Sequence, residues 1–369
     1  MPSILLIDDQ EQALAELESA IRRQLSEHEG RILRWLPDPH GRPAIEQWRE
    51  HVSGDVALVV TDYDLSRGQF GLLGDSVLRW CQQEAIPAAL YSRGNYATLP
   101  TVPDLFELNV HISEPDIGRT IVDIFRGFVA IDAGVQGIEL DDCYRNPAAV
   151  LARVLDHPEL EYEFAQYTVR LGSAGGALFG RLQSTHVAGA GTKPPNGAPQ
   201  QEGHTAEVRR LLTYVVGHLM VNAVLPYPGP LLTMAALCGY IGTSLEEAAT
   251  LSKHFAKARY AGPFGTSHEI YWRFEVDSIL AKAYPADTSL SEYTARRAAV
   301  EALEGRALAH HTCPRCGGVN GGFFCPFTKR AVCQREDCSV ASNSWLPPGA
   351  SACRIEADFF EEWAPLLGY

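Results

Sequence analysis

The chain lacks long apolar runs, an excess of positive charge and the compositional bias of a disordered protein. Its apolar stretches are short and interrupted by charged residues, which excludes a membrane-spanning helix on the usual length criterion. The N-terminus has neither the basic start nor the apolar core of a secretory signal, so we expect a cytoplasmic protein with no membrane partner. A formal net charge of −14 repels phosphate backbones, which argues against non-specific binding of nucleic acid by the chain as a whole.

Motifs that carry enzyme chemistry are also missing. The helical part of the sequence contains no nucleophile elbow, no phosphate-binding loop and no His-Glu metal motif. We therefore do not expect an enzyme with an active site in that region. A length of 369 residues favours two or three domains over a single core.

Short apolar runs alternate with amphipathic segments over the first third of the chain. The expected strands are residues 3–7, 32–36, 56–61, 86–91 and 108–112, and the expected helices are 11–25, 72–84 and 117–129. Uninterrupted short apolar runs are typical of strands that are buried on both faces of a parallel sheet. The pattern predicts a doubly wound α/β domain with five parallel strands, whose functional groups collect at the carboxyl ends of the strands.

Carboxylates follow two of these strands. Asp8 and Asp9 come after the first strand, and Asp62 and Asp64 come at the end of the third. Because the carboxyl ends of neighbouring parallel strands meet at one edge of the sheet, we expect these side chains to converge. Crowded carboxylates repel one another unless a hard cation binds between them, and Mg²⁺ prefers such oxygen ligands. The sequence therefore predicts a magnesium site.

With these residues in place, the segment 1–128 resembles the receiver domains of two-component response regulators. The resemblance implies a flavodoxin-like fold in which Asp8 and Asp9 hold the metal. It implies that Asp62 accepts a phosphoryl group from a histidine kinase or phosphotransfer protein, and that Ser92 is the hydroxyl switch residue that contacts this group. Enzymatic activity would then be limited to autophosphorylation and dephosphorylation at Asp62.

The sequence departs from the family at the end of the fifth strand. The family has a lysine before a proline there, whereas Glu114 precedes Pro115 in this chain, and the first lysine of the sequence is Lys193. A carboxylate in place of the cation weakens a phosphorylated state by repulsion, although an arginine such as Arg93 could compensate. Two interpretations follow: a working phosphoacceptor, or a pseudo-receiver that keeps the fold as a docking or dimerisation surface.

The remaining residues divide into three further segments. We expect a helical connector over 129–203 with a flexible loop at 188–203, a mainly α-helical domain over 204–308, and a cysteine-rich module over 309–369. The expected helices of this part include 206–225, 231–240, 245–260, 271–283 and 291–308.

Residues 231–260 resemble a helix-turn-helix. A small residue, Ala235, is followed by Gly239 near the turn, and Ser244 with Glu247 forms a capping box at the start of the second helix. Residues 261–266 would then form a turn or wing. The candidate DNA contacts on the second helix are Lys253, His254 and Lys257. Residues 204–308 contain ten basic and ten acidic residues, so a unit for protein interaction or homodimerisation is favoured over a DNA reader.

Six of the nine cysteines lie between Cys313 and Cys353, which in a chain without an export signal favours a metal site over disulfides. The pair Cys313 and Cys316 has C-x2-C spacing, and Cys333 and Cys338 form a second pair. Four thiolates complete the tetrahedral coordination of Zn²⁺, which makes the expected site structural. The alternative ligands are Cys325, His310 and His311.

These features predict a response-regulator-like signalling protein. Its receiver domain would accept phosphate at Asp62 or dock a partner, and would control a helical, zinc-stabilised output module that binds a protein effector. The alternatives are a DNA-binding transcriptional regulator that uses the helix-turn-helix, and a pseudo-receiver adaptor.

Overall fold

The computed structural model forms two compact units, and each unit is built from three separate segments of the chain. It describes residues 1–38, 42–52, 54–66, 72–92, 106, 108–111, 116–139, 146–172, 200–266, 268–285, 290–319, 321–342 and 344–365. Unit 1 comprises Met1–Ala97, Pro103–Asp156 and Leu171–His218, and unit 2 comprises Thr98–Val102, His157–Arg170 and Leu219–Tyr369.

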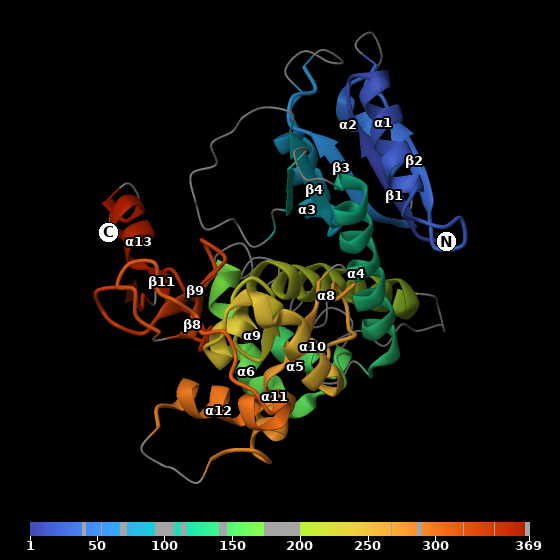
Figure 1. Cartoon of the computed structure of the whole chain (residues 1–369). Coiled ribbons are helices and arrows are strands. Elements are labelled where there is room, and N and C mark those ends of the chain that lie inside the picture. The colour runs from blue at the N-terminus through green and yellow to red at the C-terminus, as the bar shows by residue number, and fades with distance from the viewer. Residues whose placement is uncertain are drawn as a thin grey trace. The chain divides into compact units, whose positions relative to one another are not determined.

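A five-stranded sheet forms the centre of unit 1 (Figure 1). Its strands are β1 (Ser3–Ile7), β2 (Arg31–Trp35), β3 (Val56–Asp62), β4 (Ala88–Ser92) and β5 (Leu108–His111). The order is β2-β1-β3-β4-β5, and every neighbouring pair is parallel. All five residues of β1 are buried, as expected for a strand covered on both faces. The predicted five-stranded parallel sheet is confirmed, and its arrangement is compatible with a receiver-like fold.

Helices cover both faces of this sheet. The helices of unit 1 are α1 (Glu11–Arg22), α2 (Ala44–His51), α3 (Gly74–Glu84), α4 (Ile117–Gly137), α5 (Pro147–Val154) and α8 (Gln200–Leu219). Leu5 of β1 belongs to one apolar cluster with Trp48 of α2 and Val77 of α3. Helices α1 and α4 pack together so closely that a Cβ atom on Gly118 would lie 2.3 Å from the carbonyl oxygen of Ala20. The sheet is therefore doubly wound, as the sequence predicted.

Helix α4 is two turns longer than the sequence alone indicated. Residues 117–129 were expected to be helical, but α4 continues to Gly137 because Ile131 and Val135 extend the buried stripe at four-residue spacing. The boundary expected at residue 128 lies inside this helix, and the division into four segments stays a prediction. The loop expected over 188–203 lies outside the described residues up to residue 199, and α8 begins at Gln200.

One histidine in unit 1 is enclosed by aromatic rings. The ring of His218 on α8 lies 4.4 Å from that of Tyr214, 5.0 Å from that of Phe128 and 5.5 Å from that of Phe106, between ring centroids. Its Nδ1 atom lies 2.7 Å from the carbonyl oxygen of Tyr214. Complete burial lowers the pKa of His218 to about 4, because an apolar surrounding disfavours the charged imidazolium.

Because His218 is buried in its neutral form, the free energy of unfolding should begin to fall at a higher pH than the titration of carboxylates alone would cause. The unfolded chain binds a proton at His218 near pH 6.5, whereas the folded chain does so only near pH 4. We expect the free energy of unfolding to be fully retained above about pH 6.5 and to fall by up to about 3 kcal/mol as the pH drops to about 4. Denaturant titrations across this range should show the loss, and H218L should reduce it; an equally steep loss in H218L would contradict the assignment.

Unit 2 is mainly helical with short strands. It begins with the 3-10 helix η2 (Pro158–Leu160), α6 (Glu161–Ala165) and the 3-10 helix η3 (Thr168–Leu171), and resumes with the π-helix η4 (Met220–Val224). The following elements are β6 (Leu231–Thr233), α9 (Met234–Ile241), η5 (Leu245–Glu247), α10 (Ala248–His254), η6 (Ala256–Ala258), β7 (Ile270–Trp272), α11 (Arg273–Leu280) and α12 (Glu292–Glu304). The cysteine-rich end contains β8 (Gly322–Cys325), β9 (Arg330–Cys333), β10 (Ser339–Val340), β11 (Ile355–Glu356) and α13 (Ala357–Trp363).

Two segments that were expected to start as helices start as strands. β6 and β7 pair antiparallel, with Leu232 opposite Tyr271, and the helices α9 and α11 begin only after them. Short apolar runs do not distinguish a buried helix from a strand, so periodicity alone could not locate this pair. Thr233 is both the last residue of β6 and the N-cap of α9, because its Oγ1 accepts the N–H of Ala236 at 3.3 Å.

The predicted helix-turn-helix segment does form two packed helices. α9 ends at Gly242, whose φ of +80° suits a glycine, and the Oγ of Ser244 accepts the N–H of Glu246 at 3.3 Å. The second helix is divided into η5, α10 and η6 rather than continuous over 245–260. The N–H of Tyr260 donates to the carbonyl of Ile270 at 2.8 Å, so the chain after η6 pairs with β7. Residues 261–266 begin the connection between these paired segments, in the place expected for a wing.

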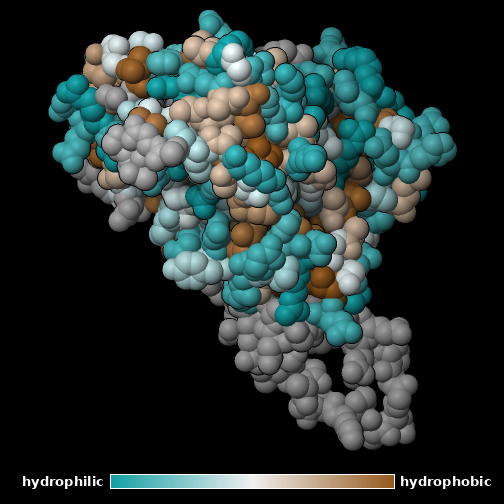
Figure 2. Space-filling view, turned by 60° about the horizontal axis from the view of Figure 1, so that its bottom comes forward, coloured by the Kyte–Doolittle hydropathy of each residue, from teal (hydrophilic) through white to brown (hydrophobic). Residues whose placement is uncertain are grey.

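Large apolar side chains are mostly buried, and the exposed ones are scattered along the chain. They include Leu36, Tyr162, Val169, Leu245 and Leu303. Figure 2 shows a face on which hydrophilic side chains dominate and hydrophobic ones are gathered in small separate patches. Within the described residues, no helix combines the length and the apolar character that crossing a membrane requires.

Candidate functional site

The first cysteine pair sits in a tight turn. The N–H of Gly317 donates to the carbonyl of Cys313 at 2.9 Å, and Gly317 has a φ of +64°, which a glycine adopts without strain. The N–H of Gly318 donates to the Sγ atom of Cys316 at 3.4 Å. This bond lowers the pKa of the Cys316 thiol to about 7, because an N–H donor stabilises the thiolate.

The second pair repeats this arrangement at the end of β9. The N–H of Arg335 donates to the Sγ of Cys333 at 3.4 Å, and the N–H of Cys338 donates to the carbonyl of Arg335 at 2.9 Å. The hydroxyl of Ser339 fixes the strand end by donating to the carbonyl of Cys333 at 2.6 Å. Each pair thus presents two sulfur atoms from one turn, with a backbone N–H directed at one of them.

Tertiary folding brings the two pairs together. The Sγ atoms of Cys313, Cys316, Cys333 and Cys338 all lie within 4.8 Å of one another. Sulfur ligands around a tetrahedral Zn²⁺ are about 3.8 Å apart, for a Zn–S distance of about 2.3 Å, so a small contraction completes the site. The four predicted ligands are therefore close enough to bind a metal such as zinc.

The chemistry of this donor set also fits a cation. Cys313, Cys333 and Cys338 are almost completely buried, and Cys316 is the most accessible of the four. Burial raises the pKa of Cys338 to about 12 and also raises that of Cys333. Several buried thiolates repel one another, so a bound divalent ion is what makes the deprotonated cluster stable.

The alternative ligands lie outside this cluster. Cys325 is buried, and its Sγ accepts the N–H of Glu356 at 3.4 Å. His311 is buried too, and burial lowers its pKa, but neither His310 nor His311 belongs to the group of close ligand atoms among the described residues. Of the alternatives left open by the sequence, the structure selects the C-x2-C pair with the C-x4-C pair.

The predicted acidic residues lie at the carboxyl edge of the sheet in unit 1. Asp8 follows β1, and Asp62 ends the neighbouring strand β3. Asp8 is completely buried; its Oδ1 accepts the N–H of Gln10 at 2.7 Å, and its Oδ2 accepts the hydroxyl of Tyr91. Asp62 is 7% exposed, and its Oδ1 accepts the N–H of Tyr63 at 2.8 Å.

These contacts give the predicted magnesium ion no support. In the part of the chain that is described, the only group of three or more metal-ligating side chains in close approach is the cysteine cluster, so Asp8, Asp9, Asp62 and Asp64 do not form one. Both carboxylate oxygens of Asp8 already accept hydrogen bonds from the chain. The Oδ1 of Asp64 accepts the N–H of Ser66 at 3.0 Å, which is a local turn contact. The expectation of a magnesium site is therefore not supported.

Sequence reasoning missed Tyr91. In the parallel register of β3 and β4, Tyr91 is the direct partner of Asp62, so its side chain projects from the same edge as the acidic residues. The strand register was the signal needed to find it. Ser92 ends β4 as predicted, whereas Arg93, Glu114 and Pro115 lie outside the described residues.

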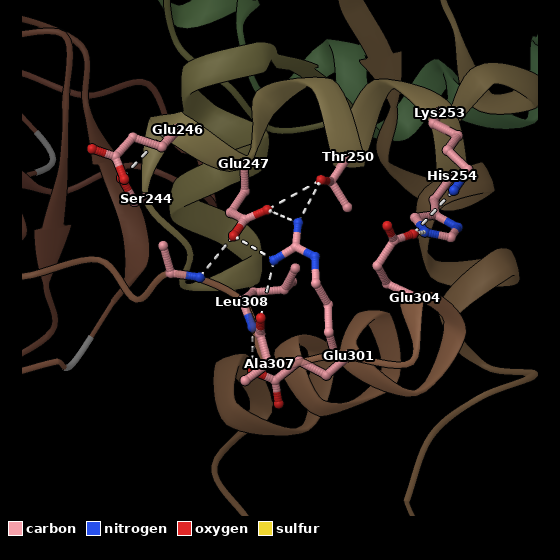
Figure 3. A network of polar contacts seen from close by, with 12 residues as sticks. Ser244, Glu246, Glu247, Thr250, Lys253, His254, Glu301, Glu304, Ala307 and Leu308 are labelled. Carbon is pink, nitrogen blue, oxygen red and sulfur yellow. Dashed lines mark hydrogen bonds and ion pairs between the residues drawn. The ribbon is translucent and has the colours of Figure 1, made fainter.

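Two of the three candidate DNA contacts, Lys253 and His254, lie next to an acidic side chain. Lys253 Nζ lies 3.2 Å from Glu304 Oε2, and His254 Nε2 lies 2.6 Å from the same oxygen (Figure 3). Lys257 is exposed on η6. The last residue of α12 thus neutralises part of the positive charge of α10, and no local sequence pattern indicates this contact between residues about fifty positions apart.

The two glutamates at the start of the second helix behave differently. Glu246 is exposed, whereas the side chain of Glu247 is only 8% exposed. The carboxylate of Glu247 accepts two bonds from Arg306, at 3.0 and 2.7 Å, and one from the N–H of Ala309 at 2.9 Å. The Arg306 guanidinium lowers the pKa of Glu247 to about 2. Glu247 therefore joins η5 to the segment that follows α12, and its carboxylate is buried instead of facing solvent.

Comparison of the chain with protein-family models, with curated proteins and with solved structures found no match.

Proposed function

We propose that this chain is a receiver-type signalling adaptor. Unit 1 docks a regulatory partner without needing phosphate or magnesium, and the helical, zinc-stabilised unit 2 delivers the output by binding a protein effector. The observation that carries this proposal is that the chain itself satisfies both oxygens of the buried Asp8 carboxylate, through the Tyr91 hydroxyl and the Gln10 N–H. We call the group of Asp8, Asp9, Asp62 and Asp64 at this edge of the sheet the acidic pocket.

The sheet order supports the receiver part of the proposal. A β2-β1-β3-β4-β5 parallel sheet places the ends of β1 and β3 side by side, which is where a receiver-like domain keeps its acidic residues. The pocket nevertheless differs from one prepared for a phosphoryl group, because the buried Asp8 carboxylate is already satisfied. Such a domain keeps the fold of a signalling module, and its carboxylates stabilise that fold by accepting hydrogen bonds from the chain.

The charge pattern of unit 2 supports a protein partner over DNA. Glu304 pairs with both Lys253 and His254, and around the metal site Arg315 lies 2.8 Å from Asp358 while Arg335 lies 3.2 Å from Asp337. Paired charges offer little attraction to phosphate, since DNA affinity depends on unpaired cations that displace counterions. Salt-dependent binding of the full chain to duplex DNA would contradict this part of the proposal.

The pocket makes a testable prediction about magnesium. We expect the full chain to show no covalent modification by acetyl phosphate and no magnesium-dependent spectral shift with beryllofluoride. Removing the Tyr91 hydroxyl in Y91F frees one oxygen of the buried Asp8, so its magnesium affinity should rise by at least about tenfold. Titration of magnesium into both proteins measures this difference.

The matched control is Y63F, which removes the hydroxyl of a neighbouring tyrosine that contacts Asp62 through its backbone N–H. Y63F should leave magnesium affinity unchanged. The adaptor proposal fails if the unaltered chain gains one phosphoryl group that D62N does not gain.

A further inference from the structure

A pocket of about 310 Å³ opens in unit 2, between the helices and the cysteine-rich module. Tyr240 of α9 and Tyr293 and Arg296 of α12 line it from the helical part, and Phe323 of β8 lines it from the other part. The two parts are in direct contact here, since a Cβ atom on Gly239 would lie 2.7 Å from the carbonyl oxygen of Phe323. Folding of the cysteine-rich module is therefore needed to form one wall of the pocket.

Two arginines line this pocket, and each of them is bonded to a glutamate. The guanidinium of Arg296 lies over the ring of Tyr240, 3.7 Å from its centroid, and also bonds to Glu292 at 2.8 Å. Arg273, on another wall, donates to the hydroxyl of Ser351 and bonds to Glu163 at 3.3 Å. Glu292 is the one acidic lining residue, and its side chain is 87% exposed, so it is easily displaced from Arg296.

The positions of these groups define the ligand class. A guanidinium presents five N–H donors in a planar fork, and the contacts of Arg296 and Arg273 within the described chain leave donors for a carboxylate. The side chains of Tyr293 and Phe323 line the pocket beside Tyr240, one face of which Arg296 covers, and they offer apolar surface to a flat body. The volume lies at the small end of the range for small-molecule sites. We propose that this pocket binds a small aromatic carboxylate, which makes unit 2 a ligand-binding unit independently of the function proposed for unit 1.

The test uses naphthoate as the probe and naphthamide as its uncharged counterpart, titrated into the full, metal-loaded chain by calorimetry. We expect naphthoate to bind at least about tenfold more tightly than naphthamide, because only the acid pairs with the guanidinium groups. R296Q and R273Q should each weaken naphthoate binding by about tenfold or more, from two different walls. Thermal melts of both variants establish that they are folded.

The matched control is R259Q, which removes an exposed arginine that pairs with Glu269 outside the pocket and should leave the affinity unchanged. Equal binding of the acid and the amide would overturn the proposal, as would folded R296Q and R273Q proteins with unaltered affinity. Absence of naphthoate binding up to about 10 mM would overturn it as well.

Discussion

Replacing Cys333 with serine is expected to release the zinc ion and unfold the cysteine-rich module. Cys333 is completely buried, ends β9, and its Sγ belongs to the cluster of four within 4.8 Å. Structural zinc contributes about 10–16 kcal/mol of apparent binding free energy in small modules, and three remaining thiolates retain only part of it. Elemental analysis should find about one zinc ion per unaltered chain and much less in C333S.

The control for this prediction is Cys325, another buried cysteine of the same module. Cys325 lies outside the group of close sulfur atoms and accepts a hydrogen bond from Glu356, so C325S should keep its zinc. Chelation of the unaltered chain should reproduce the loss of ordered structure seen for C333S. A chain that folds fully and contains no metal, or a C325S variant that loses the ion while C333S keeps it, would show that the ligand set is wrong.

Replacing Glu247 with alanine is the second large expected effect. The change leaves the N–H of Ala309 without its acceptor and removes the two bonds from Arg306 to Glu247, while Arg306 keeps its bonds to the carbonyl of Ala307 and the hydroxyl of Thr250. Arg306 is 49% exposed, so water partly replaces the hydrogen bonds that it loses. The larger loss of stability comes from the N–H of Ala309, which loses its bond to the buried carboxylate of Glu247. We expect the free energy of unfolding of unit 2 to fall by about 2 kcal/mol, measured by denaturant titration with circular dichroism.

The adjacent glutamate provides a matched control. Glu246 has the same side chain one position earlier but is exposed, so E246A should change stability by less than about 0.5 kcal/mol. The pKa of Glu247 adds a second check, because it lies near 2 in the folded chain instead of the usual 4.5. The stabilisation from this carboxylate is thus complete above about pH 4.5 and disappears as the pH falls through about 2. Equal destabilisation by E246A and E247A would refute the network.

Much of unit 1 could be predicted because its pattern is local. Five apolar runs bounded by turn residues specify strands buried on both faces, and each of the predicted runs overlaps a strand of the sheet. The same reasoning failed at β6 and β7, where three-residue strands precede helices. A run that short has no measurable period, and only pairing between segments about forty residues apart decides its structure.

The acidic pocket shows a different limit. The sequence placed Asp8 and Asp62 at one edge of the sheet, and the structure has them there on neighbouring strands. It did not indicate that the Tyr91 hydroxyl would bond to Asp8, because that contact depends on the register of β4 against β3. One hydrogen bond between distant residues thus occupies an oxygen that the sequence assigned to a metal ion.

The sequence by itself determined the alternation of strands and helices in unit 1 and the candidate metal ligands among the clustered cysteines, because burial patterns and ligand spacing are visible in nearby residues. The structure then selected Cys313, Cys316, Cys333 and Cys338 over Cys325, His310 and His311. The tertiary structure alone decided which charged groups are paired or hydrogen-bonded: Glu304 with Lys253 and His254, Glu247 with Arg306, and Asp8 with the Tyr91 hydroxyl. The physical reason is that electrostatic and hydrogen-bond energies depend on distances of a few ångströms between groups, and the sequence separation of those groups does not specify these distances.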